Sequence, residues 1–94
     1  MLFDLFKTSH DGREKVKSGA LLLDVRTPEE FRAGHVDGAR NIPVQELARR
    51  LGELGPKTQH VVVYCKSGGR SGAAAQMLRS QGYAVTDVGA MSNW

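Results

Sequence analysis

The sequence predicts an α/β fold in which a parallel sheet is covered by helices on both faces. Apolar runs of strand length recur at residues 20–25, 39–42, 61–65 and 83–88. Segments that carry helix start and stop signals separate these runs. Because strands that alternate with helices are joined by crossover connections, they align in parallel and place helices on both faces of the sheet.

Length and composition predict one small domain that spans residues 1–94. The 40% of hydrophobic and 24% of charged residues are ordinary values for a soluble globular protein. The net charge of +3 is small, and Arg49–Arg50 is the only adjacent basic pair in the sequence. The charge pattern therefore gives no support for nucleic-acid binding and favours small anions as ligands.

Two features of the sequence bear on the compartment. A single cysteine cannot form an internal disulfide, so nothing indicates an oxidising environment. The apolar start at residues 2–6 is too short for a signal peptide or a membrane span. We therefore expect a cytoplasmic protein that does not enter a membrane.

The first 19 residues carry the weakest pattern. Residues 1–10 fit either a helical turn or an edge strand, and we favour an apolar flap packed on the core over a surface that docks a partner. Asp11 and Glu14 have the spacing of a capping box, and Gly19 is suited to end the helix that would follow.

Clear signals bound the helix after the strand at residues 20–25. Thr27 can cap the helix, Pro28 fits its first position, and Glu30 can return the capping bond. Gly34 then ends it after barely two turns. The sequence therefore predicts a short helix between Thr27 and Gly34.

An amphipathic helix is predicted after the short strand at residues 39–42, which Pro43 stops. Its apolar positions recur as one helical stripe, Val44, Leu47, Ala48, Leu51 and Leu54. Gly55–Pro56 closes it. The strand at residues 61–65 then precedes a helix over residues 72–81. The inward side chains of that helix are Ala74, Met77 and Leu78, and Gly82 ends it.

The only cysteine, Cys65, stands where an apolar strand ends. A loop rich in glycine and cations follows it: Lys66, Ser67, Gly68, Gly69 and Arg70. A helix N-terminus and nearby cations lower the pKa of a thiol from its usual value near ~8.5. The two glycines allow backbone N–H groups to turn inward as an anion nest. The sequence thus predicts a reactive thiolate beside a site for a dianion such as thiosulfate, or for the outer sulfur of a persulfide.

A structural role for Cys65 is the plain alternative, because a lone cysteine is most often a small buried hydrophobe. A Gly-Gly loop with two cations is unusual for that role, so we favour catalysis. No histidine lies in the loop, but a stabilised thiolate needs no histidine base; we expect His35 to satisfy a local turn. Four residues separate Cys65 from Arg70. Phosphatases with a cysteine nucleophile use a loop one residue longer, so this loop favours a sulfur atom over a phosphoryl group.

Four stretches of the chain resemble the signature motifs of the rhodanese family. They are residues 22–31 (LLDVRTPEEF), 34–43 (GHVDGARNIP), 64–71 (YCKSGGRS) and 89–94 (GAMSNW). In the last stretch, Ala90 replaces a glycine of the family pattern. The resemblance covers residues 20–94. It implies a small three-layer α/β fold with a five-stranded parallel sheet, of which four strands are clear in this sequence.

The resemblance also implies sulfurtransferase chemistry that uses no metal or organic cofactor. By position, Cys65 would take a sulfur from thiosulfate, release sulfite, hold a persulfide and pass the sulfur to cyanide or a thiol. Lys66 to Arg70 would form the substrate cradle. Asp24 and Arg26 would support the loop as an ion-paired or hydrogen-bonded pair.

Three other functions stay open at this point. The protein could be a persulfide carrier that receives sulfur from one partner protein and delivers it to another. It could be an inactive binding module, although the cysteine, the cations and the glycines argue against this. It could be a phosphatase or arsenate reductase, which the loop length disfavours.

Overall fold

The structure of the protein is a computed structural model that describes residues 11–94. Among these residues, four strands form one sheet: β1 (Leu21–Asp24), β2 (Arg40–Asn41), β3 (Val61–Cys65) and β4 (Val85–Ala90). All neighbours are parallel, in the order β2-β1-β3-β4, which confirms the predicted parallel sheet. The resemblance implied five strands. Residues 1–10, for which we weighed an edge strand and an apolar flap, lie outside the described residues.

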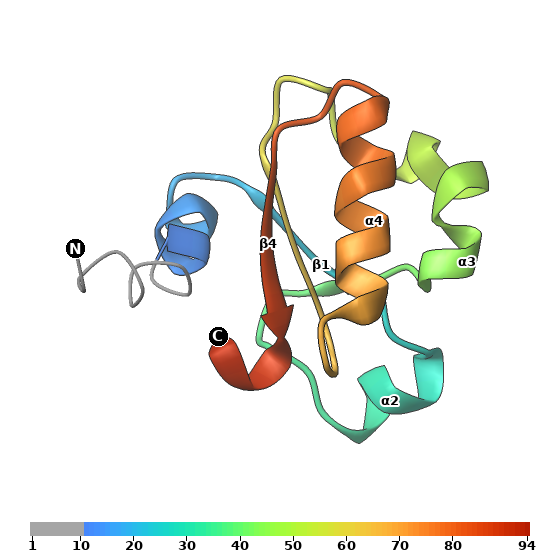
Figure 1. Ribbon diagram of the computed structural model, residues 1–94. Helices are drawn as coiled ribbons and strands as arrows, with labels where there is room; N and C mark the ends of the chain where they lie inside the picture. Colours follow the sequence, from blue (N-terminus) through green and yellow to red (C-terminus); the bar gives the residue numbers. More distant parts are fainter. Residues whose placement is uncertain (1–10) are drawn as a thin grey trace.

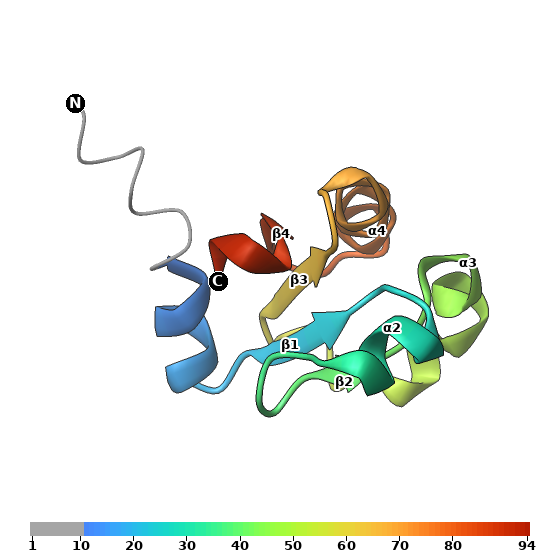
Figure 2. The same ribbon diagram turned by 90° about the horizontal axis from the view of Figure 1, so that it is seen from below.

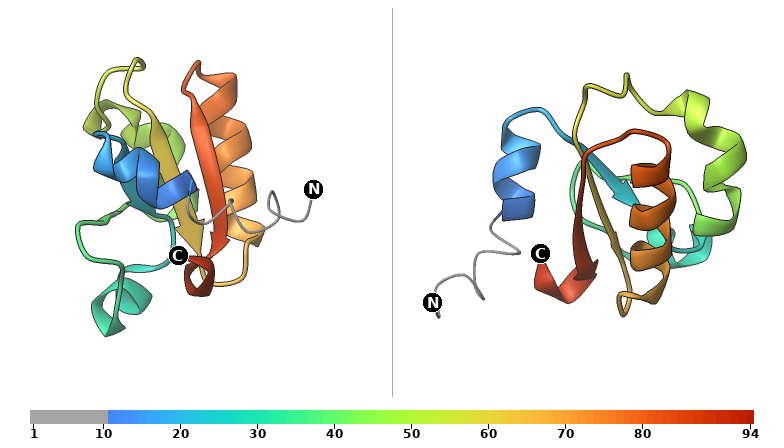
Figure 3. Two further views of the ribbon diagram at one scale, coloured as in Figure 1. Left: turned by 90° about the vertical axis from the view of Figure 1, so that its left-hand side faces the viewer. Right: turned by 45° about the horizontal axis from the view of Figure 1, so that its top comes forward.

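Helices cover both faces of the sheet, as predicted (Figure 1). One face carries α3 (Val44–Leu47), the 3-10 helix η1 (Ala48–Glu53) and α4 (Gly69–Ser80). The helical residues 11–17 lie on the opposite face, which Figure 3 shows from the side. The sheet is therefore the middle of three layers.

Two short helices lie near the carboxyl edge of the sheet. Seen from that edge, α2 (Pro28–Ala33) lies in front of β1 and β2, and the 3-10 helix η2 (Met91–Asn93) directly follows β4 (Figure 2). No helix among residues 11–94 is long and apolar enough to cross a membrane.

Side chains alternate along β3 and divide the core into two layers. Val61, Val63 and Cys65 belong to the cluster on the α4 side. Val62 and Tyr64 belong to the cluster on the other side. All five residues are buried, since β3 lies between β1 and β4 and is covered on both faces. The side chain of Cys65 therefore points toward α4.

The helix predicted between Thr27 and Gly34 is confirmed. The Glu30 N–H donates to Thr27 Oγ1 at 3.1 Å, and the Thr27 N–H donates to Glu30 Oε1 at 2.9 Å. This is a complete capping box, with Pro28 in the first turn. Gly34, at φ +153°, ends α2 after six residues.

The predicted amphipathic helix at residues 44–54 is only partly present. One turn of α-helix continues as a 3-10 helix, and Arg50 leaves helical dihedral angles at φ −112°, ψ 18°. Leu47 and Leu54 are buried as predicted, but Ala48 is exposed, so the single stripe is wrong at this position. The tighter turn changes the angular spacing of the side chains and removes Ala48 from the core face.

Three further boundaries differ from the prediction. α4 begins at Gly69 instead of residue 72, because Gly69 takes helical angles and the left-handed turn is made at Gly68 alone. β4 spans Val85–Ala90 instead of residues 83–88. Asp11 is itself helical and is not the residue before the helix. Gly19 ends that helix at φ +104°, as predicted.

The corrected course of α3 and η1 can be tested by paired substitutions. We expect Leu47→Ala to lower the free energy of unfolding by about 2–5 kcal/mol, because it leaves a cavity in the core. Ala48→Lys should change it by less than about 0.5 kcal/mol, since Ala48 is exposed. Urea denaturation of both variants measures the difference. A large loss of unfolding free energy in Ala48→Lys would show that Ala48 belongs to the buried face of the helix, as the sequence predicted.

Candidate functional site

The loop after β3 bends back over the sulfur of Cys65. Gly68 adopts φ +107°, a left-handed conformation that favours glycine, and α4 begins at the next residue. This bend directs the Gly68 N–H at Cys65 Sγ, with 2.9 Å between nitrogen and sulfur. The same residue opens the helix, because the Gly72 N–H donates to the Gly68 carbonyl at 3.0 Å. One glycine therefore fixes both the loop and the start of α4.

Ser71, in the first turn of α4, is a site residue that sequence reasoning missed. It is fully buried, and its Oγ lies 3.5 Å from Cys65 Sγ. The same hydroxyl lies within donating distance of the Gly68 and Gly89 carbonyls, at 3.2 and 3.5 Å. A side chain in the first turn of a helix points back toward the residue before the loop, so a correct helix start would have indicated a role for Ser71. We predicted the start at residue 72, which left Ser71 outside the helix.

Hydrogen bonds set the ionisation of Cys65. Burial by itself raises the pKa of this thiol, because it removes the charged form from water. The Ser71 hydroxyl and the backbone N–H groups of Ser71, Gly68 and Ser67 act in the opposite direction, and the net result is a lowered pKa. Cys65 is therefore buried without being an inert hydrocarbon-like side chain.

Arg70, which we predicted to be part of the cradle, forms an ion pair with Glu30. Its guanidinium donates to both Glu30 carboxylate oxygens, at 2.7 and 3.0 Å. The same Glu30 closes the capping box of α2. The Arg70 hydrogen bond, with the Thr27 N–H next, lowers the pKa of Glu30 to about 2. Sequence reasoning gave Glu30 only its capping role, because its second partner lies 40 residues away along the chain.

Asp24 and Arg26 form the predicted ion pair, but the pair makes its further hydrogen bond to Gly34 and not to the loop after Cys65. The Arg26 Nη2 lies 2.7 Å from Asp24 Oδ2, and both side chains are nearly fully buried. Arg26 Nη2 also donates to the Gly34 carbonyl at 2.7 Å. Among residues 11–94, none of their hydrogen bonds reaches the loop after Cys65. The pair therefore ties the end of β1 to the end of α2.

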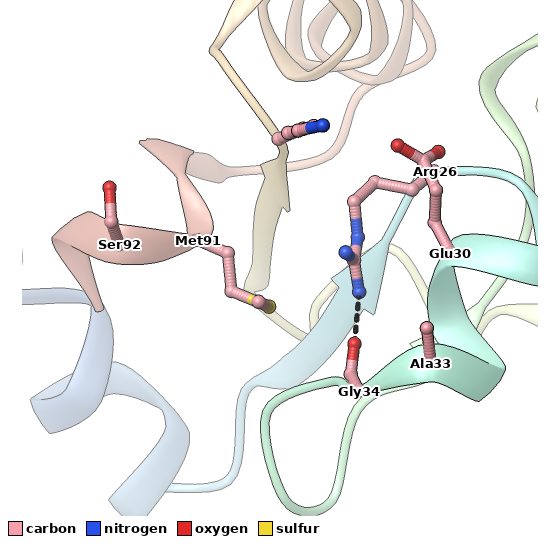
Figure 4. Close-up of a pocket in the computed structure, with 7 residues that line it drawn as sticks. Arg26, Glu30, Ala33, Gly34, Met91 and Ser92 are labelled. Carbon is pink, nitrogen blue, oxygen red and sulfur yellow. Dashed lines mark hydrogen bonds between the residues drawn. The ribbon is translucent and has the colours of Figure 1, made fainter.

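A pocket of about 500 Å³ opens between α2, η2 and the loop (Figure 4). Its lining is formed by Arg26, Glu30, Ala33, Gly34, Lys66, Met91 and Ser92. Figure 4 shows Met91 directed toward the side on which Arg26 lies. The pocket thus lies next to the residue that follows Cys65.

The predicted site residues divide into two groups. Ser67 and Gly68 direct backbone N–H groups at the sulfur. Lys66 is exposed and lines the pocket, and Gly69 is exposed at the start of α4. Outside the site, His35 stacks on Phe31 and its Nδ1 hydrogen bonds to the Phe31 carbonyl at 2.7 Å, so it satisfies a local turn as expected.

Ala90 accommodates its side chain without strain. Its φ is −74° and its ψ is 144°, which is ordinary extended backbone. The left-handed conformation falls on Gly89, at φ +82°. The replacement of the family's glycine at position 90 therefore leaves the turn after β4 intact.

Several known proteins are similar in sequence to this chain. Over 63 residues the chain is 49% identical to the Bacillus subtilis protein named "Uncharacterized protein YqhL", a match that covers 67% of this chain and 49% of the relative. It is 44% identical over 62 residues to thiosulfate sulfurtransferase PspE of Escherichia coli, covering 65% and 60%. The putative sulfur carrier protein YrkF of B. subtilis is 32% identical over 93 residues, covering 97% and 48%. The matches thus span about half to three fifths of these relatives' lengths.

A solved structure shares the fold. An E. coli rhodanese with anions superposes with a TM-score of 0.76 at 36% sequence identity, covering 81% of this chain and 92% of that chain. The TM-score and the sequence identity are both high enough to indicate a shared fold and a related sequence.

The structure is an α/β protein with a parallel sheet, in which a cysteine at the carboxyl end of an interior strand accepts a backbone N–H hydrogen bond at its sulfur. The model of the rhodanese-like domain matches residues 8–94. The chain belongs to the rhodanese-like domain family, and several of its relatives are named sulfurtransferases.

The two loop glycines should differ in their effect on the thiol. Gly68→Ala should raise the pKa of Cys65, because a side chain at φ +107° strains the turn that supplies the shortest N–H contact. Gly69→Ala is the matched control, since its new methyl group meets open space at ordinary helical angles. Titration of the thiolate by ultraviolet absorbance measures both. Equal pKa values in the two variants would show that the Gly68 turn does not stabilise the thiolate.

The two bonds of Glu30 predict a pH-dependent contribution to stability. The pKa of Glu30 is lowered to about 2 in the folded chain, so this stability is present above its unfolded value of about 4.3 and is lost as pH falls toward 2. At neutral pH, Glu30→Gln should lower the free energy of unfolding by about 1 kcal/mol. The deficit should shrink at about pH 3.

Urea denaturation at both pH values measures this deficit. Glu29→Gln is the matched control, because the Glu29 side chain is 78% exposed. It should cost little at either pH. A Glu30→Gln deficit that is the same at both pH values would contradict the assignment.

Proposed function

We propose that this chain is a sulfurtransferase that moves a sulfane sulfur through a persulfide on Cys65. The donor is thiosulfate or another persulfide, and the acceptor is cyanide or a thiol. The observation that carries this proposal is the sulfur of Cys65 beneath hydrogen-bond donors, with the Gly68 nitrogen 2.9 Å away. Similarity to PspE, which is named a thiosulfate sulfurtransferase, supports the choice of donor.

The first half-reaction follows from the ionised thiol. The Cys65 thiolate attacks the outer sulfur of thiosulfate and forms an S–S bond. The S–S bond within thiosulfate breaks, and its electron pair leaves with sulfite. The product is a persulfide anion with the same charge as the starting thiolate. N–H groups that stabilise the thiolate also suit the persulfide, because both are sulfur anions in one nest.

The second half-reaction returns the enzyme to its starting state. Cyanide or an acceptor thiolate attacks the outer sulfur of the persulfide. The bond between the two sulfurs breaks, and its electron pair returns to Cys65 Sγ. Thiocyanate or a new persulfide leaves. No oxidant or reductant is consumed in either half.

A persulfide carrier is the second candidate. It is favoured by the match to the putative sulfur carrier YrkF, which extends over 97% of this chain. In that role Cys65 would receive its sulfur from a partner protein and turn over slowly with thiosulfate. A phosphatase is less well supported, because Arg70 is paired with Glu30 and the loop is one residue short.

Sulfite release tests the proposal directly. With thiosulfate and cyanide, the wild-type chain should release sulfite continuously, and mass spectrometry of the stalled enzyme should show one added sulfur atom on Cys65. Cys65→Ser should reduce both signals to background, because a hydroxyl at this position does not ionise near neutral pH. Wild-type protein whose Cys65 has been alkylated beforehand is the control. It should lose both signals as well, which would show that the loss comes from the missing thiol and not from misfolding of the variant.

Three outcomes separate the candidates. Continuous turnover supports the enzyme. A single addition of sulfur without turnover, with faster loading by a protein persulfide, supports the carrier. Sulfite release by Cys65→Ser at the wild-type rate would contradict both.

A further inference from the structure

The ion pair of Glu30 with Arg70 joins the loop after Cys65 to a helix from a distant part of the chain. Glu30 lies in the first turn of α2, and Arg70 lies in the first turn of α4. The two ends of the Arg70 guanidinium donate to the two oxygens of one carboxylate, at 2.7 and 3.0 Å. Such a two-point pairing fixes both side chains more firmly than a single hydrogen bond does. The position of the Arg70 guanidinium therefore depends on Glu30.

The capping role of Glu30 does not by itself require a negative charge. A capping box forms with glutamine as well as with glutamate at this position of a helix. Glu30 is nevertheless ionised at ordinary pH, because the Arg70 hydrogen bond, with the Thr27 N–H next, lowers its pKa to about 2. The pair with Arg70 thus uses a charge that the capping box does not need.

Arg70 is close enough to the sulfur to act on an anion there. It ends the loop that begins at Cys65, and the next residue, Ser71, places its Oγ 3.5 Å from Cys65 Sγ. The Glu30 hydrogen bond is the first cause of the raised pKa of Arg70, and the negative charge of Cys65 also contributes. The Arg70 side chain is 34% exposed, so the ion pair is not sealed in the core. An anion that approaches Cys65 therefore enters the field of this pair.

Glu30 cancels most of the positive charge that Arg70 would present to such an anion. The other cation of the loop, Lys66, is exposed and takes part in none of the ion pairs among residues 11–94. The loop therefore carries two cations, of which one is committed to a carboxylate. An unpaired Arg70 could bind the oxygens of a donor, because its parallel N–H groups suit two oxygens of one anion.

We propose that Glu30 is a positioning residue that sets the selectivity of the site for the charge of the sulfur donor. The proposal rests on the proposed sulfurtransferase function. Glu30 holds the Arg70 guanidinium and limits its attraction for the donor. Without the carboxylate, Arg70 is released to pair with the donor's oxygens. A dianion gains more from this release than a monoanion does, because the Coulomb energy is proportional to the charge.

Two donors with the same transferable sulfur test the proposal. Thiosulfate is a dianion, and methanethiosulfonate is a monoanion in which a methyl group replaces one oxygen. With either donor, the Cys65 thiolate bonds to the outer sulfur, the S–S bond of the donor breaks, and sulfite or methanesulfinate leaves with the electron pair. Persulfide formation is followed in a single turnover by mass spectrometry of quenched samples, which gives a second-order rate constant for each donor.

The ratio of these constants, thiosulfate over methanethiosulfonate, is the donor-charge preference. A change in the amount of folded protein or of thiolate affects both donors equally and leaves this ratio unchanged. Glu30→Gln should raise the ratio about threefold, the effect of one partly exposed charge pair. In an Arg70→Gln background, Glu30→Gln should leave the ratio unchanged, because the guanidinium that it releases is absent.

Two controls separate the ion pair from other effects of the change. Glu29→Gln removes the same charge from the preceding side chain, which is 78% exposed, and should leave the donor-charge preference at its wild-type value. Thr27→Ala removes the hydroxyl of the capping box and retains both members of the pair of Glu30 with Arg70. It should also leave the preference unchanged, since it weakens α2 without removing the carboxylate.

The outcomes distinguish this proposal from the one on which it rests. A persulfide that forms with the same donor-charge preference in the wild type and in Glu30→Gln would overturn the role of Glu30 and leave the sulfurtransferase function intact. A rise that persists in the Arg70→Gln background would show direct repulsion by Glu30, and would overturn its action through Arg70. A wild-type chain that forms no persulfide from either donor or from a protein persulfide would overturn both proposals. A rise that needs Arg70, and that neither control reproduces, supports the inference.

Discussion

The hydrogen bonds that Ser71 and the Gly68 N–H make to the sulfur of Cys65 are the contacts on which the site depends. Burial works against an ionised thiol, and in this chain Cys65 is fully buried. Hydrogen-bond donors fixed close to the sulfur offset that cost here. The left-handed turn at Gly68 supplies one such N–H and begins α4, whose first turn brings in Ser71. The backbone conformation of one residue therefore links the fold to the chemistry.

Two ion pairs organise the charges around this contact. The pair of Asp24 with Arg26 joins β1 to the end of α2, and the pair of Glu30 with Arg70 joins the start of α2 to α4. In each pair, an arginine near the site is bound to a carboxylate of the fold. Lys66 stays exposed beside the pocket. The division explains how a loop with two cations holds its shape through one of them and leaves the other exposed.

The sequence predicted those parts of the fold that depend on local signals. The buried strand before Cys65 and the capping box at Thr27 were visible because their evidence lies within a few neighbouring residues. The start of α4 was misplaced, because two consecutive glycines read as loop although only Gly68 leaves helical angles. The second partner of Glu30 and the burial of Ser71 could not be predicted, since both depend on segments that meet only in the folded chain.

The pH dependence of Cys65 alkylation tests the central claim most directly. Iodoacetamide reacts with the thiolate, so the inflection of the rate against pH reports the pKa of this side chain in the folded protein. A thiolate supported by backbone N–H groups and the Ser71 hydroxyl should give an inflection clearly below the ordinary thiol value of about 8.5. An inflection at or above that value would mean that burial outweighs the hydrogen bonds, and that Cys65 is a structural residue.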